Sequence, residues 1–171
     1  RGLARAVFTQ AYAVIPRGTM SDIVTSFLPH WEGTRLWVLS RPLSGFAETF
    51  SQYIMEVQPG GGSERPESDP EAEGVLFVVD GEATVMLGAE EHVLKRGGYA
   101  YLPPSCGWRL TNRGGTAARF HWIRKRWQPA AGVERPDPIV TNESEVAPSP
   151  MPDTEGAWAT TRFVDPADGK V

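Results

Sequence analysis

The sequence is poor in the residue types on which disulfide frameworks and metal centres depend. It has one cysteine, Cys106, among 171 residues, which excludes a disulfide bond within the chain. A single thiol suits a reducing compartment, so we expect a cytoplasmic location. The three histidines, His30, His92 and His121, are scattered, and none of them forms a pair at metal-ligand spacing.

Long apolar runs and an excess of positive charge are also missing. No apolar stretch approaches the roughly 20 residues that a membrane-spanning helix needs. Thr9 and Gln10 interrupt the apolar stretch near the N-terminus, which therefore differs from a signal peptide. The net charge of -4 at pH 7 disfavours a nucleic-acid partner. We expect a soluble protein with neither a membrane nor a nucleic acid as partner.

Short segments rich in β-branched and aromatic residues fill most of the chain, separated by Gly, Pro, Asp and Asn. No window has the period of a long helix. Many strands at short spacing are typical of a sandwich or a barrel. We predict strands at Ala6–Val14, Arg35–Ser40, Glu48–Val57, Val75–Val79, Ala83–Leu87, Glu91–Leu94, Tyr99–Leu102, Gly107–Thr111 and Ala118–Arg124.

Two local signals concern the ends of strands. Asp80 and Gly81 lie between two apolar runs, and because glycine accepts a positive φ, we predict a hairpin there. The strand that ends before Pro103 should stop pairing at that point, because proline has no N–H to donate.

The segment 118–126 alternates between aromatic and polar side chains. We expect Phe120 and Trp122 to face one side, and Arg119, His121 and Arg124 to face the other. The cations at 124–126 then either bind phosphate or, by default for such a run, lie in solvent or contact another domain.

Composition changes near Gln128. Residues 128–157 are rich in Pro, Ala, Ser and acidic residues, which is typical of an extended linker. The apolar piece Trp158–Val164 predicts one more strand. We therefore expect a barrel over residues 1–127, a linker over 128–157, and the start of a second domain at 158–171. Because there is no initiator Met, we also expect that the start of the chain has been trimmed.

The segment 97–112 carries glycine, proline and asparagine at a characteristic spacing. Gly97 is followed by Pro103 after five intervening residues, by Trp108 after four more, and by Asn112 after three more. This pattern resembles the second motif of the cupin fold, in which a metal-binding His stands where this chain has Trp108.

The first cupin motif is Gly, five residues, His, one residue, His, three or four residues, Glu, six residues, Gly. Counted from Gly61, its positions fall on Glu67, Asp69 and Glu73, and Gly81 comes one residue late. Both histidines are absent. The resemblance implies an all-β, cupin-type double-stranded β-helix, or jelly-roll barrel, with a Pro-rich C-terminal extension and without the metal ligands of the family.

A narrower resemblance covers most of the chain. Residues 5–42 and 120–129, followed by the Pro-rich segment, are similar to the N-terminal half of the bicupin (S)-ureidoglycine aminohydrolases. Some of these are called glyoxylate-induced or allantoin-utilisation proteins. The resemblance implies two tandem barrels, of which the second holds manganese and the catalytic residues and the first holds no metal. It also implies a ureide substrate, ammonia release and a homo-oligomer.

Each candidate side chain has a second interpretation. Trp108 either lines a substrate pocket or fills the interior, as side chains do in small barrels. Glu67, Asp69 and Glu73 carry the oxygens that Mn²⁺ and Mg²⁺ prefer, but their segment also has the composition of a solvated loop. Cys106 lacks a neighbouring base, which favours a buried small residue over a reactive thiol.

Three functions from different classes stay open. The chain is the non-catalytic half of a manganese-dependent aminohydrolase, a metal-free cupin that binds a small ligand in its barrel, or a purely structural or oligomerisation module. The linker and the trailing strand favour the first. On that interpretation the chain has no catalytic residue and no cofactor, and its partner is the second cupin domain of the same polypeptide, where the manganese is expected.

Overall fold

The structure, a computed structural model, describes residues 7–8, 13–14, 28–41, 49–165 and 167–168. All regular elements in these ranges are β-strands. The prediction of an all-β fold is therefore confirmed. No helix in the described part of the chain is long and apolar enough to cross a membrane.

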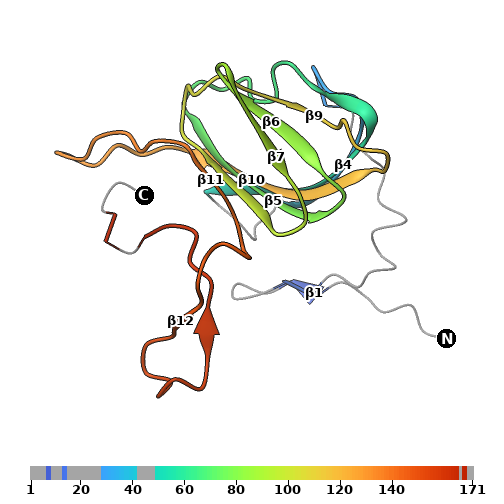
Figure 1. Cartoon of the computed structure of the whole chain (residues 1–171). Coiled ribbons are helices and arrows are strands. Elements are labelled where there is room, and N and C mark those ends of the chain that lie inside the picture. The colour runs from blue at the N-terminus through green and yellow to red at the C-terminus, as the bar shows by residue number, and fades with distance from the viewer. Residues whose placement is uncertain (1–6, 9–12, 15–27, 42–48, 166, 169–171) are drawn as a thin grey trace.

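Nine strands form one curved antiparallel sheet that closes into a barrel (Figure 1). Hydrogen bonding follows the order β11-β8-β5-β10-β4-β9-β6-β7, and β3 pairs with β4. In Figure 1, β6, β7 and β9 form one wall, and β4, β5, β10 and β11 lie opposite. The strands are β3 (Glu32–Ser40), β4 (Phe50–Ser63), β5 (Ala72–Asp80), β6 (Ala83–Leu87), β7 (Glu90–Leu94), β8 (Gly98–Leu102), β9 (Trp108–Thr111), β10 (Ala118–Arg126) and β11 (Ile139–Asn142).

The strands predicted from Arg35 onward correspond to β3 to β10, with shifts of a few residues at their ends. As predicted, β8 ends directly before Pro103. At the N-terminus, β1 (Val7–Phe8) and β2 (Ala13–Val14) pair with each other. The remainder of the predicted strand Ala6–Val14 lies outside the described residues.

The long strand β4 joins the two halves of the barrel. Its first part pairs with β3 and β10, and its last residues, Gly62 and Ser63, pair with β9. Gly62 has a φ of 145°, and a Cβ added there would lie 2.1 Å from the carbonyl oxygen of Leu110. Only glycine permits this approach of two backbones, which lets β4 bend across to the opposite wall.

The prediction of a hairpin at Asp80-Gly81 is wrong. β5 pairs with β8 and β10, whereas β6 pairs with β7 and β9, so the strands on either side of the turn are not partners. Gly81 does have a positive φ, of 70°. The turn therefore carries the chain from one wall to the other. The hairpin comes later, between β6 and β7, where Gly88 has a φ of 60°.

The core lies between the walls and is built by alternation along the strands. On β10, Phe120 and Trp122 are buried, as expected from the period of two. The side predicted for Arg124 is wrong, because a residue two positions after Trp122 shares its face. The largest side chains that are fully buried include Met55, Leu76, Leu102 and Leu110.

The segment after Gln128 is more structured than an extended linker. β11 lies within it and pairs with β8 along the edge of the barrel sheet. The β-branched run Ile139-Val140-Thr141 suits this edge, because such residues favour extended backbone. Further on, β12 (Ser149–Pro150) and β13 (Ala159–Thr160) form a separate hairpin that points away from the barrel (Figure 1).

Candidate functional site at the barrel mouth

Three tryptophans fill one end of the barrel interior, which we call the mouth. Trp31 lies directly before β3, Trp108 begins β9, and Trp122 lies on β10. The ring centroids are 6.4 Å apart for Trp31 and Trp108, and 5.8 Å apart for each of the other two pairs. All three are buried, with at most 6% of their surface exposed. The position where a cupin motif has its ligating His is therefore part of a packed aromatic cluster.

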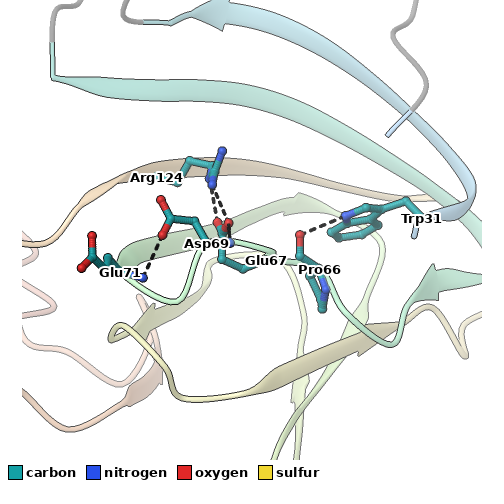
Figure 2. A network of polar contacts seen from close by, with 6 residues as sticks. All are labelled: Trp31, Pro66, Glu67, Asp69, Glu71 and Arg124. Atoms are coloured by element: carbon teal, nitrogen blue, oxygen red, sulfur yellow. Dashed lines mark hydrogen bonds and ion pairs between the residues drawn. The ribbon is translucent and has the colours of Figure 1, made fainter. Parts of the chain in front are cut away.

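The indole N–H groups of this cluster have different surroundings. Trp31 donates from Nε1 to the carbonyl oxygen of Pro66 at 3.4 Å (Figure 2). The buried Nε1 of Trp122 has no hydrogen-bond partner. It lies against Gly74, where an added Cβ would be 3.2 Å from this nitrogen. Gly74 therefore provides the space that the indole of Trp122 occupies.

An ion pair lies beside the tryptophan cluster. Arg124 donates from Nε and Nη2 to the two carboxylate oxygens of Glu67, at 2.6 and 2.5 Å (Figure 2). The same carboxylate accepts the backbone N–H of Asp69 at 2.9 Å. Burial disfavours the charged form of Arg124, but the hydrogen bond and charge of Glu67 outweigh it and raise the pKa of the guanidinium. The charged guanidinium therefore binds the carboxylate in a bidentate arrangement.

Glu73 lies in a different place from Glu67. It accepts a hydrogen bond from the hydroxyl of Tyr101 at 2.7 Å and pairs with Lys125 at 3.3 Å. These three residues line a hollow of about 210 Å³ on the outer side of the sheet. Burial first, and then Glu73, raise the pKa of Tyr101, which stays protonated at neutral pH.

The cationic end of β10 is matched by acidic residues of the segment 67–73. Arg126 pairs with Glu71 at 2.9 Å, so each of the three consecutive cations has a carboxylate partner. All three cations line one hollow of about 490 Å³, but each of them is already paired with a carboxylate of the same barrel. These ion pairs fasten the acidic loop to the strand.

A cleft of about 420 Å³ opens beside this loop. Glu67, Asp69, Cys106 and Trp108 are among the residues that line it. Burial raises the pKa of the Cys106 thiol, which keeps it protonated and weakly nucleophilic. The cleft therefore offers carboxylates and an indole edge to a ligand, and no activated nucleophile.

The histidines do not converge on the cleft. His30 adopts a positive φ of 69° in the turn before β3. His92, on β7, lies 3.4 Å from Glu90, and His121, on β10, lies 3.4 Å from the side-chain nitrogen of Gln52. Burial lowers the pKa of His121, so the neutral imidazole is favoured. A turn and two different strands therefore carry the three histidines, as their scattered positions in the sequence suggest.

A comparison with protein families matches residues 53–124 to the cupin domain. This match spans β5 to β9 and most of β4 and β10, which are seven of the nine strands of the barrel described above. The barrel has the cupin fold. The jelly-roll fold expected from the sequence motifs is confirmed.

Solved structures extend the comparison beyond the cupin barrel. A protein from Pseudomonas aeruginosa named as glyoxylate-induced is 56% identical, with a TM-score of 0.89 over 99% of this chain. The protein Ylba from E. coli is 25% identical, with a TM-score of 0.75 over 85% of this chain. The chain spans 64% and 58% of the lengths of these two proteins.

More distant cupins share the fold alone. A cupin domain from Schizosaccharomyces pombe is 13% identical, with a TM-score of 0.52 over 72% of this chain and 85% of its own. A search of curated proteins finds no match to the sequence.

The second cupin motif serves the fold in this domain. Asn112 is fully buried, and its side-chain nitrogen donates to the carbonyl oxygens of Val57 and Thr116, both at 2.8 Å. Its side-chain oxygen accepts the backbone N–H of Gly114 at 2.8 Å. Asn112 therefore shapes the loop 112–116 and ties it to β4, and Trp108 nearby packs rather than ligates.

The residues of this cupin do not fit a manganese site of the usual kind. No three His, Cys, Asp or Glu residues within the described ranges are arranged to hold a metal. Glu67 faces a guanidinium, Glu73 lies on the outer side, and Trp108 offers no lone pair. The weak candidates Glu67, Asp69 and Glu73 are therefore not brought together as a ligand set.

The sequence did not indicate two of the residues at the mouth, Arg124 and Trp31. Arg124 was placed on the wrong face, although its position two residues after Trp122 puts it at the mouth. Trp31 belongs to no motif, and nothing local indicates that it packs against residues more than seventy positions away.

Proposed function

We propose that this cupin is the metal-free, non-catalytic half of a two-barrel ureidoglycine aminohydrolase. In the intact polypeptide a second cupin would carry manganese and release ammonia from ureidoglycine, and this barrel would support it. One observation carries the proposal: the mouth, where the fold elsewhere binds its metal, is filled by three tryptophans and a bidentate ion pair.

The chemistry of the mouth supports this division of labour. A cupin metal is a cation held by neutral and acidic ligands, and here the guanidinium of Arg124 supplies the positive charge beside Glu67. Three indoles then exclude water from the interior. Packed side chains therefore occupy the position at which a catalytic barrel keeps an open coordination site on its metal.

The similarity to longer proteins supports a second domain. The Pseudomonas aeruginosa protein matches nearly the whole of this chain and is named as glyoxylate-induced, a name found among the bicupins that the sequence resembles. This chain spans less than two thirds of that protein. Bound manganese in the second barrel would act as a Lewis acid towards the substrate.

The test compares the full-length polypeptide with residues 1–171 on freshly generated ureidoglycine. We expect the full-length protein to release ammonia, to lose this activity when chelator removes manganese, and to regain it when manganese returns. Residues 1–171 should match an enzyme-free blank, which corrects for spontaneous decay of the substrate. Ammonia release by residues 1–171 at the full-length rate would contradict the proposal.

A second candidate function rests on the cleft of about 420 Å³ at the mouth. A metal-free cupin with this cleft would bind a small polar ligand against Trp108 and the loop that contains Glu67. Titrating residues 1–171 with ureides and following tryptophan fluorescence distinguishes the two. Saturable binding that is lost in Trp108→Phe would favour the ligand-binding function, and no binding favours the structural one.

A further inference from the structure

We propose that the hairpin of residues 149–160 is a docking arm, and that its exposed Trp158 and Met151 insert into the barrel that follows in the same polypeptide. This inference rests on the proposed function and names the surface through which the two barrels join.

The arm has a defined structure although it buries little. Beyond the pairing of β12 with β13, the backbone N–H of Met151 donates to the carbonyl oxygen of Trp158 at 2.9 Å. The hydroxyl of Thr154 donates to the carbonyl oxygen of Met151 at 2.7 Å, and the N–H of Ala157 donates to that of Thr154 at 2.9 Å. Local hydrogen bonds therefore hold Met151 and Trp158 opposite each other.

The side chains at this pair are unusually exposed for their type. Trp158 is 70% exposed and Met151 is 45% exposed. They account for two of the four large hydrophobic residues that are exposed in the described part of the chain. Tryptophan and methionine are among the types that are enriched at protein interfaces, where a buried indole often contributes much of the binding energy. In Figure 1 the arm points away from its own barrel, so it does not cover its own core.

The chain after the arm returns to the outer face of the barrel. Phe163 stacks on Tyr99, with ring centroids 4.4 Å apart and planes 5° apart, and lies 6.0 Å from Phe77. Tyr99 also lines the outer hollow of about 210 Å³ that contains Tyr101. A domain that continues from this point would begin beside the hollow, with the arm extending past it.

Two observations select the following barrel as the occupant. First, the Pseudomonas aeruginosa relative has more than a third of its length outside the part that this chain spans. Phe163, three residues after β13, holds the chain that follows the arm on the outer face of the barrel. Second, residues 151–158 contain Asp153 and Glu155 and no Lys or Arg. From charge complementarity we expect the arm to insert into an apolar pocket that is surrounded by cations.

The experiment is hydroxyl-radical footprinting of the full-length protein and of residues 1–171. Trp158 and Met151 should be oxidised about tenfold more slowly in the full-length protein, as expected when an exposed side chain becomes an interface anchor. This protection should stay the same when the protein concentration is varied over roughly a hundredfold range, because an intramolecular contact does not depend on concentration. Val93, which is 50% exposed on β7, is the internal control and should react equally in both proteins.

A variant gives a second readout. Trp158→Ala should lower the Tm of the full-length protein by roughly 4–8 °C and leave that of residues 1–171 unchanged, whereas Val93→Ala should leave both unchanged. Equal oxidation of Trp158 in both proteins would overturn the inference. So would protection that appears only at high concentration, because the occupant would then be a second copy. Protection of Trp158 without ammonia release by the full-length protein would support the docking arm and contradict the proposed reaction.

Discussion

At the scale of single residues, the mouth shows how a metal position is replaced. Glu67, at the first metal-ligand position of the motifs, is engaged by Arg124, and Trp108, at the last metal-ligand position, packs against two other indoles. Each exchange removes a ligand and adds an interaction that stabilises the barrel without metal. The consequences are measurable as changes in the free energy of unfolding.

Arg124→Met should lower the free energy of unfolding by about 2 kcal/mol, because it leaves the mostly buried carboxylate of Glu67 without its cation. Urea denaturation of residues 1–171 measures the change. Arg126→Met is the matched control, since its pair with Glu71 is largely exposed, and it should cost at most about 1 kcal/mol. Equal effects of the two substitutions would contradict the role given to the Glu67–Arg124 pair.

Protonation of His121 should destabilise the barrel. Burial lowers its pKa in the folded state, so the unfolded chain binds the proton more readily. Stability is therefore fully present above the unfolded pKa of about 6.5 and is lost as pH falls from there towards the lowered folded pKa. The loss between pH 7.5 and 5.5 should be smaller in His121→Gln than in the wild type. His92→Gln is the comparison, and an unchanged pH dependence in His121→Gln would refute the prediction.

At the scale of elements, the barrel depends on where strands bend and cross. β4 changes partners at its glycine run, and the turn at Gly81 moves the chain between walls instead of folding it back. At both places the backbone of one strand lies against that of another, so the absence of a side chain decides the path. Gly62 and Gly81 are therefore required by a close backbone contact, whereas other glycines are required only by the positive φ of a turn.

Gly62→Ala should be far more destabilising than Gly60→Ala. Both glycines have a positive φ, but a Cβ at Gly62 would lie 2.1 Å from a backbone oxygen, whereas one at Gly60 meets nothing within 4 Å. Gly60→Ala should cost about 1–2 kcal/mol from backbone strain alone. Gly62→Ala should cost at least about 3 kcal/mol or prevent folding, because strand pairing must shift. Thermal unfolding followed by circular dichroism tests this, and similar midpoints for the two variants would disprove it.

At the scale of the whole molecule, a barrel with a packed mouth and a protruding hairpin suits a supporting role. The ion pairs of the segment 67–73 fasten its loop to β10, and the arm carries the exposed Trp158 away from the barrel. The ion pairs hold the loop on its own barrel, and the hairpin exposes apolar side chains outward, where the proposed second barrel would lie.

Residues 1–171 should contain far less than one equivalent of transition metal after purification. The guanidinium of Arg124 repels a cation beside Glu67, and Trp108 provides no ligand. Elemental analysis by mass spectrometry measures this. Near-stoichiometric manganese that disappears in Glu67→Ala or Glu73→Ala would show that the mouth or its rim does hold a metal.

The sequence alone was sufficient for the features that depend on neighbours in the chain. Alternation of period two placed eight strands and the buried Phe120 and Trp122, and the spacing of Gly97, Pro103 and Asn112 indicated the fold. These signals are local, because side-chain direction and turn geometry are set within a few residues.

Only the tertiary structure decided which segments meet. Asp80-Gly81 has the residues of a hairpin turn, yet the chain crosses there to the other wall, since β5 pairs with β8 and β10 and β6 pairs with β7 and β9. Glu67 has the position of a metal ligand, yet it binds Arg124, which lies 57 residues further along the chain. Strand pairing and ion pairing depend on the closure of the whole barrel, and a local pattern does not specify which distant residue will arrive beside it.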